Sequence, residues 1–313
     1  MSFSAFVAFP GQGSQHISML SKGGISDIAK SKEYSSAIEF CSELISNDVL
    51  KLIEEGPEDL INQTSITQPV LLLCSYLHFE RLKNLINFNP EYLAGHSLGE
   101  YSALVAADSI SIFNALLLVR KRGELMEIAQ KGSMCAIMGL DKEVISQICE
   151  DVSVDETSHV QCANLNSPSQ TVISGHEDAV TKAIDLCSLK GAKRSIILKV
   201  SIASHSRLML KISKEFDEFL NNIDFQIPKI KILHNVSVKP SESIEDLRSL
   251  LVSQLYSPVR WSEICGEIKR LNLPIIECGP GKVLGGLFKA NKLDNYFSTS
   301  EEDFYEKIIN HER

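Results

Sequence analysis

Residues 92–103 read YLAGHSLGEYSA, a run that contains the pattern Gly-x-Ser-x-Gly at Gly95, Ser97 and Gly99. Apolar residues precede the pattern, and a helix-forming run follows it at 101–107. This strand, turn and helix context places a serine on a sharp elbow with its hydroxyl exposed above a sheet. The glycines allow close backbone approach, and the free N–H groups of the following helix favour negative charge beside the serine. Ser97 is therefore the candidate nucleophile, against the alternative of an ordinary glycine-flanked turn.

The composition indicates a globular chain that can bury a large core. Its 313 residues are 44% hydrophobic, which suits one large domain, alone or with a smaller one. A net charge of -9 argues against nucleic acid as the main partner. Eight scattered cysteines, with no metal-ligand spacing, predict reduced thiols and no metal site. Without a basic leader or a long apolar run, we expect a cytoplasmic protein with no membrane anchor.

The first part of the chain has the pattern of an α/β protein. Residues 3–9 predict a buried strand that ends at Pro10-Gly11. The glycine loop at 11–15 lacks the spacing of a nucleotide site, yet such a loop at the carboxyl end of a strand is where ligands bind in open sheets. Helices are predicted at 33–54, from Gln68-Pro69 to about residue 85 with the proline in the first turn, and at 111–130.

Gly132 marks a change of pattern. Strands are predicted at 134–140, 160–165, 170–174 and 194–200, with helices at 142–150 and 178–190. The order βαββαβ is ferredoxin-like, so residues 131–198 are expected to form an inserted small subdomain, and residues 1–130 and 199–313 to rejoin into one larger sheet. The later part predicts helices at 207–221, 244–255 and 261–271, and strands at 230–235 and 274–278. The polar tail after 294 is expected to be peripheral.

A serine nucleophile needs a base, and His205 is the best placed of the eight histidines. It directly follows the apolar run 196–200 in a serine-rich loop, although loop histidines are often merely exposed. Arg122 lies near the apolar face of its predicted helix, where a guanidinium needs a partner. That partner is either a substrate carboxylate or a carboxylate of the protein. An acid between Ser97 and His205 would complete a hydrolase triad, and the pattern singles none out.

Nine motifs in chain order resemble the malonyl-CoA:acyl carrier protein transacylase family, from about residue 3 to about 290. They are FPGQGSQ at 9–15, TQP at 67–69, GHSLGEYSAL at 95–104, RG at 122–123, NLNSP at 164–168, VSIASH at 200–205, QLY at 254–256, PV at 258–259 and GPGKVL at 279–284. The resemblance implies an α/β-hydrolase-like large domain with a ferredoxin-like insertion.

The resemblance also implies a Ser–His dyad, with Ser97 acylated and His205 as its base. A main-chain carbonyl in the segment of Gln254, itself assigned to substrate binding, would orient the imidazole and replace the missing acid. The backbone N–H groups of Gln12 and Leu98 would form the oxyanion hole. Arg122 would bind the malonyl carboxylate.

The implied activity is transfer of a malonyl group from malonyl-CoA to acyl carrier protein for fatty acid biosynthesis, by a monomer without a cofactor. Ala203-Ser204 departs from the family, because relatives often carry proline or a bulkier residue there. The sequence therefore does not exclude a branched acyl group such as methylmalonyl as the substrate in place of malonyl. Other readings are an acyl-thioester hydrolase, a trans-acting acyltransferase of polyketide synthesis, and a non-catalytic carrier-binding subunit.

Overall fold

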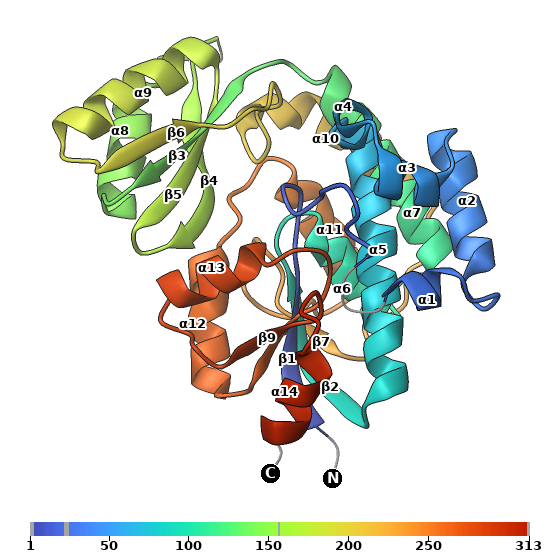
Figure 1. The fold of residues 1–313 in the computed structure, drawn as a ribbon. Coiled ribbons are helices and arrows are strands. Elements are labelled where there is room, and N and C mark those ends of the chain that lie inside the picture. The colour runs from blue at the N-terminus through green and yellow to red at the C-terminus, as the bar shows by residue number, and fades with distance from the viewer. Residues whose placement is uncertain (1–2, 22–24, 156, 312–313) are drawn as a thin grey trace.

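The computed structural model describes residues 3–21, 25–155 and 157–311. Its larger sheet has five parallel strands in the order β7-β2-β1-β8-β9 (Figure 1). These strands are β1 (Phe3–Phe9), β2 (Phe88–Gly95), β7 (Lys231–Ile232), β8 (Ile275–Glu277) and β9 (Tyr296–Ser298). β1 confirms the predicted strand at 3–9, whereas the strands predicted at 230–235 and 274–278 are shorter than expected.

β1 lies at the centre of this sheet and is apolar on both faces. Ala5, Val7 and Phe9 belong to the largest core cluster, and Phe6 and Ala8 to the second. The first cluster takes in α5 (Thr64–Leu85), α6 (Gly99–Ala106) and α7 (Ile112–Ile128), and the second takes in α12 (Trp261–Leu271) and α13 (Val283–Ala290). Helices therefore cover both faces, as a parallel sheet requires.

Shorter helices complete the large domain. They are α1 (Ile25–Ala29), α2 (Ser35–Ile45), α3 (Val49–Glu55), α4 (Glu58–Ile61), the 3-10 turn η1 (Arg207–Met209), α10 (Leu210–Leu220), α11 (Ile244–Gln254) and α14 (Phe304–His311). Two helices, α2 and α3, occupy the stretch 33–54, where the sequence predicts helices. α2 ends at Ser46, which has a left-handed backbone, and the Asp48 side chain caps α3 by accepting from the N–H of Lys51.

The predicted start of α5 is wrong. The helix begins at Thr64, so Pro69 lies inside it and not in its first turn. Proline has no N–H to donate to the carbonyl four residues earlier, which is that of Ser65. Arg120 of α7 donates from Nη1 to this Ser65 oxygen at 2.9 Å. The neighbouring helix thus supplies the hydrogen bond that the proline removes, and α5 continues.

The tail after residue 294 is not peripheral, contrary to the prediction. β9 pairs in parallel with β8 and extends the sheet. Phe304 and Ile308 of α14 are buried in the main core. The tail is polar on average, but Phe304 and Ile308 stand at helical spacing, and these two residues are enough to dock the short helix.

The second sheet is antiparallel and confirms the ferredoxin-like prediction. Its strand order is β4-β5-β3-β6. The elements are β3 (Ser133–Met138), α8 (Lys142–Val152), β4 (Val160–Ser167), β5 (Gln170–Gly175), α9 (Glu177–Leu189) and β6 (Arg194–Ile197). Both helices pack on one face, where Ile145, Ile148, Val180 and Ala183 share a core with the strands. β6 ends three residues before the predicted limit of 200.

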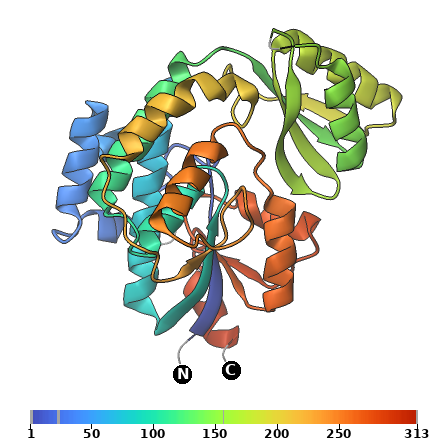
Figure 2. The ribbon, with the colours of Figure 1, turned by 180° about the vertical axis from the view of Figure 1, so that it is seen from behind.

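The small subdomain lies beyond the carboxyl ends of the large sheet (Figures 1 and 2). We propose 131–198 as its limits, since all four strands fall inside them. The two linkers meet, because Lys131 bridges to Ile202. A third connection joins β4 to the large domain: Leu165 N donates to Val259 O at 2.9 Å, and Val259 N donates to Ala163 O at 2.8 Å. The insertion is thus held at its edge strand as well as at its ends.

No helix in the described ranges is long and apolar enough to span a membrane.

Close packing of α5 against α7 depends on Gly123. A methyl group there would lie 2.6 Å from Ser65 Cα and 2.9 Å from Thr64 O, both backbone atoms. We expect Gly123→Ala to lower the free energy of unfolding by about 1–3 kcal/mol, measured by urea denaturation. Gly266→Ala in α12, where no atom lies within 4 Å, is the matched control. It should stabilise by up to about 1 kcal/mol. Equal effects of the two substitutions would contradict this packing argument.

Candidate active site

Ser97 lies on a tight backbone elbow between β2 and α6. Its φ angle is 52°, in the left-handed region that serine rarely adopts. A Cβ on Gly95 would lie 1.8 Å from the carbonyl carbon of Gly99, and one on Gly99 would lie 2.2 Å from Phe9 O. Only glycine fits at either position. The elbow predicted from the Gly-x-Ser-x-Gly pattern is therefore present, pressed against the end of β1.

His205 contacts the serine directly. Its Nε2 lies 2.8 Å from Ser97 Oγ, and its Nδ1 lies 2.7 Å from the carbonyl oxygen of Gln254. A carbonyl only accepts, so Nδ1 carries the proton and Nε2 is the free acceptor for the serine hydroxyl. Burial lowers the pKa of His205 to about 3, and the positive charge of Arg122 adds to the shift. The imidazole is thus held neutral and oriented as a base.

Arg122 is buried beside the same hydroxyl, with only 1% of its surface exposed. Nη1 donates to Gln68 Oε1 at 2.9 Å, while Nη2 donates to Gln254 Oε1 at 3.1 Å and to Ser97 Oγ at 3.3 Å. Over the described ranges, Arg122 makes no ion pair, and its Nε has no hydrogen-bond partner. The alternative of a structural ion pair with the protein is therefore wrong. The guanidinium keeps capacity for a carboxylate.

Gln254 joins several parts of the site from the end of α11. Its Nε2 donates to Ser97 O at 3.0 Å and to Glu100 Oε2 at 2.8 Å. Glu100 also accepts from Nδ1 of His234 at 2.6 Å. One amide therefore connects the cation Arg122, through its Oε1, with the buried carboxyl group of Glu100. The side chain of Gln254 is fully buried.

Asn235 holds the elbow, although no sequence motif singles it out. Its Oδ1 accepts from Ser97 N at 2.8 Å, and its Nδ2 donates to Gly95 O at 2.6 Å. Its own N–H donates to Glu100 Oε2 at 3.1 Å. Glu100 and Gln68 were also given no role. The position of Asn235 just after a strand that neighbours β2 was a usable signal, because strand ends of a parallel sheet meet at one edge.

The two backbone N–H groups that the resemblance assigns to the oxyanion hole lie in different loops. Leu98 follows the serine at the start of α6, and Gln12 lies in the glycine loop after β1. A Cβ on Gly11 would lie 2.2 Å from His96 O, so this loop packs against the elbow. Among the hydrogen bonds of the described residues, none uses the N–H of Gln12 or Leu98. The Gln12 side chain is anchored on Thr64 Oγ1 at 3.1 Å.

Ser97, His205, Arg122 and Gln254 contact one another directly at the carboxyl edge of the large sheet. Leu98 follows Ser97 in the chain, and Gln12 lies in the loop that packs against the elbow. In the part of the chain that the structure describes, no group of His, Cys, Asp or Glu side chains is arranged to hold a metal ion. The chemistry available is that of a serine hydroxyl, a neutral imidazole, a buried cation and two backbone donors.

Comparisons with known proteins agree with this arrangement. Residues 5–283 match the model of the acyl transferase domain family. The chain is 41% identical over 291 residues to the malonyl CoA-acyl carrier protein transacylase of Haemophilus influenzae, covering 90% of both chains. It is 40% identical over 293 residues to that of Bacillus subtilis, covering 92% of this chain and 90% of the relative.

Solved structures show the same fold over nearly the whole length. The malonyl CoA-acyl carrier protein transacylase from Coxiella burnetii superposes with a TM-score of 0.91 at 35% identity, covering 98% of this chain and 97% of that one. A malonyl-transacylase solved in complex with a type II PKS acyl-carrier protein gives a TM-score of 0.90 at 35% identity, with coverages of 99% and 100%. The chain therefore belongs to the acyl transferase family, among its malonyl CoA-acyl carrier protein transacylases.

Proposed function

We propose that this chain moves a malonyl group from malonyl-CoA to the phosphopantetheine thiol of an acyl carrier protein, for fatty acid biosynthesis. One observation carries the proposal: Ser97 Oγ lies 2.8 Å from the neutral imidazole of His205 and 3.3 Å from the buried guanidinium of Arg122. An activated alcohol beside an unpaired cation suits an acyl thioester that ends in a carboxylate. The names of the relatives point to the same substrate pair.

In the first half-reaction, His205 Nε2 takes the proton of Ser97 as Oγ attacks the thioester carbonyl. The tetrahedral oxyanion accepts hydrogen bonds from the N–H groups of Gln12 and Leu98. The carbonyl of Gln254, which accepts from Nδ1, stabilises the imidazolium that forms. CoA leaves as its thiol with the proton from Nε2, and a malonyl ester remains on Ser97.

In the second half-reaction, the carrier's thiol gives its proton to Nε2 and attacks this ester. Collapse of the second oxyanion returns the proton to Ser97 Oγ and releases malonyl carrier protein. Both half-reactions therefore use the same base and the same two N–H donors.

Arg122 is proposed to select the acyl group. In malonyl, one methylene separates the carboxylate from the thioester carbonyl, so the carboxylate lies close to the attacking oxygen. The guanidinium is within hydrogen-bond distance of that oxygen, which suits this short spacing. Two parallel hydrogen bonds to the carboxylate would also orient the carbonyl for attack.

Two alternatives remain distinct proposals. A hydrolase on this fold would release free malonate without a carrier protein at rates similar to transfer. A carrier of polyketide synthesis is favoured by one observation, the likeness to a malonyl-transacylase solved with a type II PKS acyl-carrier protein. Assays with both kinds of carrier separate the pathways.

We further propose that the chain works in the cytoplasm, with no cofactor beyond its CoA substrate. All eight cysteines are free thiols, and seven of them are buried. Free thiols are typical of a reducing compartment.

The acyl-serine predicts covalent labelling. Wild type exposed to malonyl-CoA should gain one malonyl group, found on Ser97 by mass spectrometry of the intact protein and its peptides. Ser97→Ala should gain none, because its side chain has no nucleophile. Ser102→Ala, on the helix that follows the elbow, is the control and should label as wild type does. Equal labelling of the Ser97→Ala variant would refute the assignment.

The cation predicts acyl selectivity. Arg122→Ala should reduce acylation by malonyl-CoA about 10²- to 10³-fold, since the malonate charge would then be buried without its partner. Acylation by acetyl-CoA, which has no carboxylate, should fall far less. Lys121→Ala, which removes a partly exposed charge one residue away, controls for general electrostatics. Equal losses with both thioesters would remove the selectivity role.

The buried imidazole predicts activity in mild acid. A base is lost on protonation, so a pKa held near 3 keeps His205 competent as the pH falls. We expect kcat/KM for acylation by malonyl-CoA, measured by rapid quench, to stay level from pH 8 down to roughly pH 5, well below the ordinary histidine pKa. An inflection near pH 6.5 that belongs to the free protein would contradict the assignment.

A further inference from the structure

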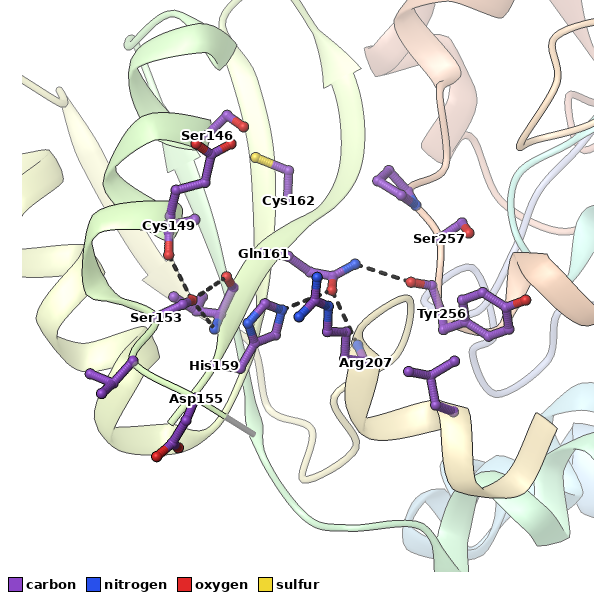
Figure 3. A pocket seen from close by; sticks show the side chains of 15 residues that line it. Ser146, Cys149, Ser153, Asp155, His159, Gln161, Cys162, Arg207, Tyr256 and Ser257 are labelled. Carbon is purple, nitrogen blue, oxygen red and sulfur yellow. Dashed lines mark hydrogen bonds between the residues drawn. The ribbon is translucent and has the colours of Figure 1, made fainter. Parts of the chain in front are cut away.

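A cavity of about 690 Å³ is lined by residues of both the small subdomain and the large domain (Figure 3). Its walls include β4, the 3-10 turn at Arg207 and the loop at 256–258. Gln161 projects from β4 across this cavity toward the large domain, as Figure 3 shows. Its side chain connects the inserted subdomain to the backbone of the proposed base.

The Gln161 amide makes four polar contacts. Its Nε2 donates to the carbonyl oxygens of His205 at 3.1 Å and Tyr256 at 3.0 Å. Its Oε1 accepts from Arg207 N at 3.2 Å and lies 3.1 Å from His159 Nε2. The two carbonyls can only accept and the Arg207 N–H can only donate, so the amide must place its NH₂ group toward the carbonyls and its oxygen toward the N–H. His159 must then donate from Nε2.

The two carbonyls belong to the two segments that hold the imidazole. His205 has a φ angle of 58°, a conformation that needs outside support in a residue other than glycine. Its N–H donates to Leu255 O at 2.9 Å, and its Nδ1 donates to Gln254 O. Tyr256 continues the same acceptor segment. Gln161 therefore joins the segment that carries the base to the segment that orients it.

We propose that Gln161 is a positioning residue for His205, and that the inserted subdomain thereby takes part in setting the geometry of the base. The inference rests on the proposed role of His205. Loss of the amide would free the 205 and 254–256 segments to shift, and small displacements of a base from its proton reduce rate strongly. Because both half-reactions use His205, both should slow, with little change in substrate binding.

The test compares Q161A and Q161E with wild type at pH 8, by the rate of Ser97 acylation from malonyl-CoA and by malonyl transfer from acyl-enzyme to carrier. We expect Q161A to lower kcat roughly 10- to 100-fold in both half-reactions with KM changed less than about twofold. Gln147→Ala is the control: its amide contacts only Asp151 on the exposed face of α8 in the same subdomain. It should match wild type.

Q161E separates hydrogen-bond donation from packing. A carboxylate has almost the volume of the amide but cannot donate to the two carbonyls, so Q161E should be at least as slow as Q161A. Near wild-type kcat in either variant, or a loss confined to KM, would overturn the proposal. Should Q161A fail to fold, as judged by thermal unfolding, Q161E carries the test. A wild type that is never acylated would refute the proposed function, whereas acylation at equal rates in all variants would refute only this inference.

Discussion

The charge of Arg122, buried without a carboxylate partner, is the constraint on which the site depends. A buried cation is costly unless hydrogen bonds satisfy it, and here neutral amides from Gln68 and Gln254 supply them. Gln254 in turn donates to Glu100, so one amide lies between the buried cation and a buried carboxyl group. The arrangement stabilises the guanidinium while leaving its charge uncancelled, which is the state that an incoming anionic acyl group requires.

The same constraint accounts for a dyad in place of a triad. A carboxylate placed to orient His205 would also lie near Arg122 and compete for it. A main-chain carbonyl orients the imidazole without bringing a negative charge. Burial and the positive charge of Arg122 lower the pKa of His205, and no negative charge on the orienting group opposes them. The base is therefore weak as a proton acceptor in the ground state, and the oxyanion donors must supply much of the stabilisation during reaction.

Local patterns in the sequence were enough for the elbow, β1 and the ferredoxin-like order, because each is encoded in one continuous stretch of the chain. The errors came where distant residues override local signals. Pro69 is tolerated inside α5 because Arg120 satisfies Ser65 O. The contacts that were missed, between Asn235 and Ser97 and between Gln254 and Glu100, join residues more than 100 positions apart in the chain. Gln161, an uncharged residue in a strand, carried no signal of its contact with His205 at all.

The order of strands in the large sheet has a consequence for biosynthesis. β1 leaves the ribosome early and pairs with β2, yet its other neighbour, β8, begins only at Ile275. Until then one edge of a seven-residue strand rich in phenylalanine has no native partner. Exposed apolar edges of this kind promote aggregation during folding. The nascent chain therefore has a long interval in which chaperones can bind β1, whereas all the strands of the inserted subdomain have left the ribosome soon after Ile197 is added.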